Sequence, residues 1–296
     1  MKKFRYLIEY WATLGVALCT RGFSLRGALL LGDLLGDFAF YGVRMRRRVT
    51  LDNLTAAFPK KSPQELRAIA RRAYRNFAKM MIEYIRFPEL STQTIRDRVK
   101  IENEHYLRLA MEGTKGAVCV GGHFGNWELM GAAVRAAGYP MCFLVGEQHN
   151  KLVDNLMNRY RELVGIEIIH MGMAVRGVLR ALRQNKLVAM LSDQDAGREG
   201  VFVQFFNRPA STHRGPATFA LKVGSPILFG SAIRLQGGKH RVIFEEVNYD
   251  SAAGLTPENT ERVTQAYSAI LEKYVRLYPD HWFWMHRRWK SKPATP

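Results

Sequence analysis

Residues 117–138 read AVCVGGHFGNWELMGAAVRAAG, and this stretch decides the fold class of the 296-residue chain. The apolar run at residues 117–120 predicts a buried strand, and two glycines follow it. From Asn126 onward, apolar residues return every three or four positions, which is typical of a helix. A strand that leads directly into a helix is a repeating unit of α/β folds, so we expect that fold class.

Other short apolar runs alternate with helical patterns after residue 115, at residues 141–145, 166–169, 187–191, 226–231 and 241–247. This alternation predicts an α/β domain with a mixed, mostly parallel sheet flanked by helices. The aromatic-rich segment 200–212, GVFVQFFNRPAST, is predicted to form an antiparallel hairpin, which would leave the sheet mixed.

Positive charge is concentrated in the N-terminal third of the chain. The formal net charge is +18, and residues 1–100 hold 20 Lys and Arg against 8 Asp and Glu. Such an excess implies an anionic partner, which could be nucleic acid, a phospholipid surface or an acidic protein.

Residues 1–48 have the composition of a segment that lies on a membrane. The longest run without charge, Tyr10 to Thr20, is about half of the roughly 20 residues that a spanning helix needs. Trp, Phe and Leu stand beside Lys and Arg, and Arg44 and residues 46–48 form an arginine cluster. We expect amphipathic helices in the membrane interface, with a hydrophobic helical hairpin packed on the domain as the alternative.

The chain is then divided into a membrane-associated, basic helical region, residues 1–100, and an α/β domain, residues 101–296, unless both form one continuous domain. Within the first region a long helix is predicted from residue 62. Ser62 is the expected N-cap, Pro63 takes the first helical position and Glu65 completes a capping box.

A histidine followed five residues later by a carboxylate occurs three times, as His123 with Glu128, His149 with Asp154 and His240 with Glu245. The third pair stands in a predicted strand, on opposite faces and roughly 16 Å apart. The second pair lies about 140° apart around a predicted helix, unless His149 precedes that helix. Only the first pair spans a turn from a strand into a helix, where Glu128 can fold back toward the His123 ring.

A histidine oriented by a carboxylate is a general base, so His123 and Glu128 are the predicted catalytic residues. A histidine that merely caps a helix terminus is the alternative. The sequence has no G-x-S-x-G elbow, no Walker A loop and no zinc-ligand spacing, so the substrate's own hydroxyl is the expected nucleophile. Cys119 falls inside a predicted strand and is expected to be an inert, buried thiol.

Several ordered motifs extend this reading over nearly the whole chain. They are RRRVTLDNLTAAFPKKSPQEL at 46–66, GGHFGNWE at 121–128, NRYRELVGIEII at 158–169, MLSDQDAG at 190–197 and YPDHWFWMHRRWK at 278–290. With these motifs the chain resembles the bacterial lipid A biosynthesis acyltransferases, the late lauroyl and myristoyl transferases of the lysophospholipid acyltransferase superfamily. The resemblance implies fatty acyl transfer from acyl carrier protein to a hydroxyl of a lipid A precursor, in lipopolysaccharide biosynthesis at the cytoplasmic face of the cell inner membrane.

The resemblance also implies site residues. His123 and Glu128 match the family's catalytic pair. Arg159 matches a position resembling the active-site arginine, and Arg161 is close enough to be confused with it. The fork of N–H donors on such an arginine could stabilise negative charge on a thioester or a phosphate.

Five more residues are candidates for binding substrate. Asp193 and Asp195 match the strand end in the DQD motif. Thr212, His213 and Arg214 could line the donor or acceptor groove, although a polar turn is equally consistent with them. Two carboxylates across one residue are too few ligands for a metal, so neither a metal nor another cofactor is predicted.

Three anionic partners fit the basic surface: acyl carrier protein, a phosphorylated lipid A precursor or related glycolipid, and the phospholipid surface of the inner membrane. Transfer to another glycolipid or a lysophospholipid is the alternative among enzymes. A non-enzymatic binder of anionic membrane or nucleic acid is the alternative of another class, but motifs of nucleic-acid-binding folds are absent from the sequence and no nucleic-acid partner is predicted.

Overall fold

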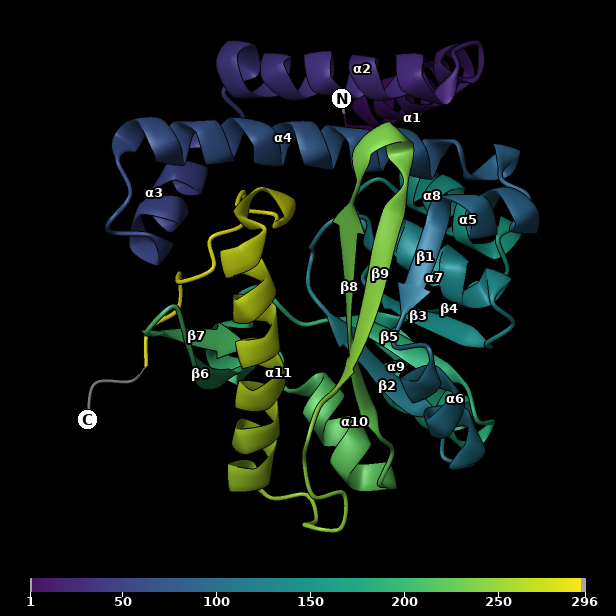
Figure 1. Ribbon diagram of the computed structural model, residues 1–296, viewed down its shortest axis with the longest axis vertical. Helices are drawn as coiled ribbons and strands as arrows, with labels where there is room; N and C mark the ends of the chain where they lie inside the picture. Colours follow the sequence, from purple (N-terminus) through teal and green to yellow (C-terminus); the bar gives the residue numbers. More distant parts are fainter. Residues whose placement is uncertain (1, 294–296) are drawn as a thin grey trace.

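The computed structural model describes residues 2–293, without the side chains of Lys2 and Lys3. Its centre is a seven-stranded sheet in the order β1-β9-β8-β2-β5-β3-β4 (Figure 1). The strands are β1 (Val99–Glu102), β2 (Ala117–Gly121), β3 (Met141–Val145), β4 (Glu167–His170), β5 (Leu187–Leu191), β8 (Ile227–Arg234) and β9 (His240–Glu246). Neighbouring strands are parallel except β8 and β9. The predicted α/β class and the mostly parallel sheet are therefore confirmed.

Two details of the predicted sheet were incomplete. The hairpin of β6 (Val201–Phe205) and β7 (Arg208–Thr212) is antiparallel as expected, but it forms a separate two-stranded sheet. The main sheet is mixed because β9 pairs antiparallel with β8, so that β9 and its parallel neighbour β1 run opposite to the other five strands. The edge strand β1 was not predicted, because it is only four residues long and half of its residues are only partly buried.

Helices cover both faces of the main sheet, because successive side chains of a strand point to opposite faces. Ala117 and Cys119 of β2 pack with α7 and α6, whereas Val118 and Val120 pack with α9, α10 and α11. The covering helices are α5 (Thr92–Arg98), α6 (His105–Glu112), α7 (Trp127–Ala136), α8 (Lys151–Leu163), α9 (Ala174–Arg183), α10 (Gly215–Val223) and α11 (Pro257–Leu277). Short 3-10 turns connect other elements at Phe87–Glu89, Met171–Met173, Gly197–Glu199, Gln236–Gly238 and Pro279–His281.

The N-terminal helices form a layer across one end of the sheet (Figure 1). They are α1 (Lys2–Arg21), α2 (Leu25–Asp37), the π-helix η1 (Phe38–Val43), α3 (Arg47–Ala57) and α4 (Pro63–Ile85). The predicted capping box at Ser62 and Glu65 is present and starts α4. Helix α2 lies so close to α4 that a Cβ on Gly36 would approach the Cα of Arg75 to 2.6 Å, which explains the glycine.

The first two helices and η1 present many exposed apolar side chains, here called the N-terminal apolar surface: Phe4, Leu7, Ile8, Trp11, Val16, Leu18, Phe23, Leu30, Leu34, Leu35, Phe38, Tyr41 and Val43. Among residues 2–293, no helix has the length and apolar character required to cross a bilayer.

Candidate active site

His123 lies in the turn between β2 and α7, as the sequence predicted. Asn126 caps α7 by accepting a hydrogen bond from the Leu129 backbone N–H at 2.9 Å. Gly125 has φ +61°, and a Cβ there would lie 1.6 Å from the Ala232 carbonyl oxygen, so the turn requires glycine. The C-terminal segment fastens the turn, because the Phe283 N–H donates to the His123 carbonyl and the Gly125 N–H to the His281 carbonyl.

The carboxylate that holds the His123 ring is Asp193 and not Glu128. The Nδ1 atom of His123 is 2.7 Å from Oδ1 of Asp193, and the His123 backbone N–H donates to Oδ2 at 2.8 Å. Strand pairing explains this contact. Gly121 of β2 lies opposite Leu191 of the parallel strand β5, so His123 and Asp193 each stand two residues beyond paired positions at the same edge of the sheet.

Asp193 is completely enclosed by the site. Its Oδ2 also accepts a hydrogen bond from Trp282 Nε1 at 2.7 Å. Burial raises the pKa of Asp193, but the His123 charge and the hydrogen bonds from His123 and Trp282 outweigh it and lower the pKa to about 2. Asp193 is therefore an ionised acceptor, which places a proton on Nδ1 of His123 and leaves Nε2 as the basic nitrogen.

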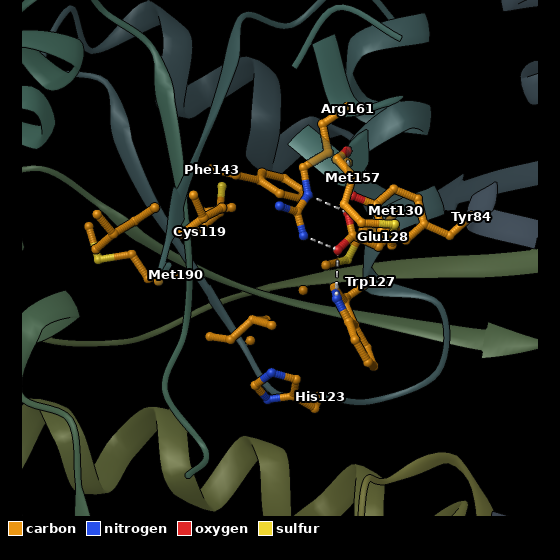
Figure 2. Close-up of a pocket in the computed structure, with 18 of the residues that line it drawn as sticks. Tyr84, Cys119, His123, Trp127, Glu128, Met130, Phe143, Met157, Arg161 and Met190 are labelled. Atoms are coloured by element: carbon orange, nitrogen blue, oxygen red, sulfur yellow. Dashed lines mark hydrogen bonds and ion pairs between the residues drawn. The ribbon is translucent and has the colours of Figure 1, made fainter. Parts of the chain in front are cut away.

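Glu128 instead forms a buried ion pair with Arg161. Its oxygens accept from Arg161 Nε at 2.9 Å and Nη2 at 2.6 Å, and from Trp127 Nε1 at 3.1 Å. Figure 2 shows Trp127 between His123 and Glu128. The rings of His123 and Trp127 pack edge to face, with their centroids 5.0 Å apart. Glu128 thus touches His123 only through Trp127, because its carboxylate is already engaged by these donors.

The structure distinguishes the two candidate arginines. Arg161 points into the site, where Nη1 also donates to Asn158 at 2.7 Å. Burial disfavours its charge, but the pair with Glu128 raises the pKa of Arg161 above its ordinary value, so it stays protonated. Arg159 lies on the exposed surface of α8 and does not line the pocket.

These groups line a largely apolar pocket of about 640 Å³. Its walls come mainly from α4, α7 and α8 and from the strands β2, β3 and β5. His123, Glu128 and Arg161 line it (Figure 2), together with Asp154 and His213. Flexible thioether side chains dominate the apolar lining and can adapt to a long chain: Met80, Met81, Met130, Met141, Met157, Met171 and Met190. Cys119 also lines it, and burial raises the pKa of this thiol to about 12, which makes it a poor nucleophile.

Asp195, Thr212 and Arg214 lie outside the pocket lining, whereas His213 is part of it. Asp195 accepts hydrogen bonds from the backbone N–H and the hydroxyl of Ser291, and Thr212 is buried against Arg288. Arg214 is exposed and lines a different cavity. Within the described part of the chain, no three His, Cys, Asp or Glu side chains come together as a metal-binding group.

Sequence reasoning did not single out two groups that organise the site. Trp282 belongs to the closing aromatic motif, but nothing in its local pattern indicated that its indole holds Asp193. Glu83 of α4 is buried and accepts hydrogen bonds from Asn126 Nδ2 at 2.7 Å and from Arg98 and Arg234, each at 2.6 Å. The position of Glu83 on the buried face of an amphipathic helix could have indicated that it has a buried partner, but not which residues those partners are.

A histidine held by a buried carboxylate beside a largely apolar pocket is the arrangement expected of an enzyme whose substrate carries a hydrocarbon chain. The model of the bacterial lipid A biosynthesis acyltransferase family matches residues 1–291, and the chain belongs to that family of acyltransferases. It is 25% identical to a lipid A biosynthesis palmitoleoyltransferase of Escherichia coli (strain K12) over 97% of this chain and 93% of the relative.

Two other relatives show how far the similarity extends. A lipid A biosynthesis lauroyltransferase of the same organism is 24% identical over 96% of this chain and 93% of its own. A phosphatidylinositol mannoside acyltransferase of Mycolicibacterium smegmatis is 22% identical over 75% and 72%. The family resemblance predicted from the motifs is confirmed.

Proposed function

We propose that this enzyme transfers a fatty acyl chain from acyl carrier protein to a hydroxyl of a lipid A precursor, with His123 as the general base. The observation that carries the proposal is the His123 ring, fixed at Nδ1 by buried Asp193 and lining the apolar pocket. Among the described residues, no hydrogen bond is recorded to its Nε2 atom, so this nitrogen is available to a substrate hydroxyl.

In the proposed reaction, Nε2 of His123 takes the proton of the acceptor hydroxyl as the hydroxyl oxygen attacks the thioester carbonyl carbon. A C–O bond forms, the C–S bond breaks, and the proton passes from His123 to the departing thiolate. Asp193 keeps the Nδ1 proton in place and stabilises the imidazolium between these two steps. No covalent intermediate on the enzyme is required, in keeping with the raised pKa of the Cys119 thiol.

Glu128 and Arg161 have a separate task in this scheme. A guanidinium has five N–H donors, and Glu128 and Asn158 engage three of those on Arg161. The other N–H donors of Arg161 can face a substrate oxygen. Glu128 holds the guanidinium group of Arg161 in place and neutralises its positive charge in the apolar pocket. We therefore assign Glu128 the positioning of Arg161 instead of the orientation of His123.

The N-terminal apolar surface supports a peripheral position at the cytoplasmic face of the inner membrane. Exposed Phe, Trp and Leu side chains on α1 and α2 can enter the headgroup region, while the neighbouring arginine cluster contacts lipid phosphates. A lipid acceptor would then reach the pocket from the bilayer. Carbonate or high salt should extract a peripheral protein from membranes, and a requirement for detergent would contradict the proposal.

Another glycolipid is the alternative acceptor, and the mannoside acyltransferase similarity is the observation that favours it. The deciding experiment incubates the purified full chain with acyl carrier protein charged with defined fatty acids and either a lipid A precursor or a phosphatidylinositol mannoside. Mass spectrometry should find an acylated lipid A precursor. Acylation of the mannoside alone would support the alternative, and binding of DNA but not anionic vesicles, without transfer, would contradict both.

A further inference from the structure

Helix α9 carries a row of three exposed arginines, Arg176, Arg180 and Arg183, here called the α9 arginine row. Their spacing of four and three residues places them on one helical face. Val175 and Leu179 border the row, and together with Gln184 these side chains line a shallow groove of about 380 Å³. The surface therefore combines a line of positive charge with a narrow apolar edge.

The fold does not neutralise this row. Among the described residues, these three guanidinium groups have no ion pair or side-chain hydrogen bond, and residues 168–192 contain no Asp or Glu. Helix α4 is also rich in arginine but is different, because Arg71 and Arg75 both pair with Asp37. Three unpaired like charges on one face are unfavourable for the isolated helix, so a complementary anionic partner would relieve them.

The row begins close to the pocket that holds the proposed reaction. Met171 lines that pocket, and the turn Met171–Met173 leads directly into α9. Both methionines are exposed, as is Val175 in the first turn of the helix. A protein seated on α9 would thus be placed beside an entrance through which a flexible, thioester-bearing arm could reach His123.

The α9 arginine row is separate from the N-terminal apolar surface. Helix α9 packs on β3, β4, β5 and α10, whereas α2 packs on α4, and α1 packs on α8 and α4 (Figure 1). A bilayer in contact with α1 and α2 already has its apolar anchors there. This separation favours a protein over the membrane as the occupant of α9.

We propose that the α9 arginine row docks an acidic helix of the acyl carrier protein that donates the acyl chain. The inference rests on the proposed function, since it assumes a carrier protein as donor. Carboxylates spaced along one face of that helix would pair with the arginines, and its apolar side chains would meet Val175 and Leu179. Such contacts steer association, so they act on donor binding and not on the chemical step.

The test is the triple variant Arg176→Glu, Arg180→Glu and Arg183→Glu of the full chain. Its matched control is Arg67→Glu, Arg108→Glu and Lys222→Glu, which makes the same change in net charge at exposed positions on three other helices. The Kd for acyl carrier protein charged with a fatty acid, and the KM for the same donor, should rise at least about tenfold in the α9 variant and less than about threefold in the control. The kcat at saturating donor should stay within about threefold of the parent in both.

Further measurements keep the outcomes distinct. Circular dichroism and a thermal melt establish that both variants fold. If the triple variant does not fold, the single replacements Arg176→Glu and Arg180→Glu take its place, and each should show a smaller rise in Kd. An unchanged Kd in a folded variant overturns the docking proposal, as does a loss of binding to anionic vesicles without a change in Kd. Absence of transfer by the parent from any charged carrier protein would instead contradict the proposed function.

Discussion

His123 and His240 each form a hydrogen bond with a buried carboxylate, but of the two only His123 lines the pocket. The ring of His240 is 1% exposed, and its Nε2 lies 3.0 Å from Oε1 of Glu83, among Arg98 and Arg234. The side chain of His123 is 24% exposed and lines the pocket. A histidine–carboxylate pair can thus join secondary structures or move a proton, and access to the second nitrogen separates the two roles.

The Glu83 site connects four elements next to the turn that holds His123. Glu83 comes from α4, Arg234 and His240 from the ends of β8 and β9, and Arg98 from the end of α5. Its hydrogen bond to Asn126 also fixes the cap of α7, on which Glu128 stands. The His240 pair therefore supports the turn that carries His123, the proposed base.

The largest effect on activity is expected from His123→Ala. A positioned general base contributes about 10²–10⁴-fold, so acyl transfer from the carrier protein should fall by that factor while the melting temperature stays close to the parent's. His149→Ala is the control, because His149 is exposed in the loop before α8 and has the same sequence spacing to a carboxylate. Near-normal transfer by a folded His123→Ala protein would refute the assignment of the base.

The largest effect on stability is expected from Glu83→Gln. This change leaves Arg98 and Arg234 buried without their counter-charge, and breaking such a network costs about 3–5 kcal/mol. Denaturant unfolding of the full chain should show that loss, whereas the exposed control Glu112→Gln should change the free energy of unfolding by less than about 0.5 kcal/mol. A parent-like free energy for Glu83→Gln would show that the network does not support the fold.

A loss of activity of the same order is expected from Asp193→Asn. The amide cannot stabilise the imidazolium and can favour the wrong tautomer, so kcat should fall by up to about 10⁴-fold, with little change in KM for the donor. Asp195→Asn is the control, since Asp195 contacts Ser291 and not His123. A larger loss in that control would contradict the assigned role of Asp193.

The comparison of the two histidines also shows which features of the site the sequence could predict and which it could not. Local patterns predicted the strand at residues 117–121, the turn at His123 and the capping box of α4, because residues close in sequence determine these features. They predicted Glu128 as the partner of His123 for the same reason, since it was the nearest carboxylate. Asp193 is 70 residues away, and its contact depends on β2 and β5 being neighbours in the sheet.

The same limit explains the arginines and the second histidine. The spacing in NRYRE could not decide between Arg159 and Arg161, because the choice depends on which face of α8 meets the pocket. The separation of His240 and Glu245 was predicted correctly from strand geometry, and Glu245 in fact pairs with Lys273. The true partner, Glu83, comes from a helix 157 residues earlier, which no local pattern could indicate.

The smallest expected effect is on the pH dependence of stability, in His240→Gln. Burial lowers the pKa of His240 despite its contact with Glu83, so the ring stays neutral in the folded protein. An unfolded histidine takes up a proton near pH 6.5, and therefore the free energy of unfolding contributed by His240 is fully present above that pH and decreases below it, until the lowered folded pKa is reached. One such proton changes the free energy of unfolding by at most about 1.4 kcal/mol per pH unit.

Denaturant unfolding of His240→Gln between pH 7.5 and about pH 5 should show a plot of the free energy of unfolding against pH whose slope is reduced by up to that amount, whereas His149→Gln should follow the parent. An unchanged slope in His240→Gln would mean that folding does not lower the pKa of His240, and the contrast with His123 would then rest on exposure alone.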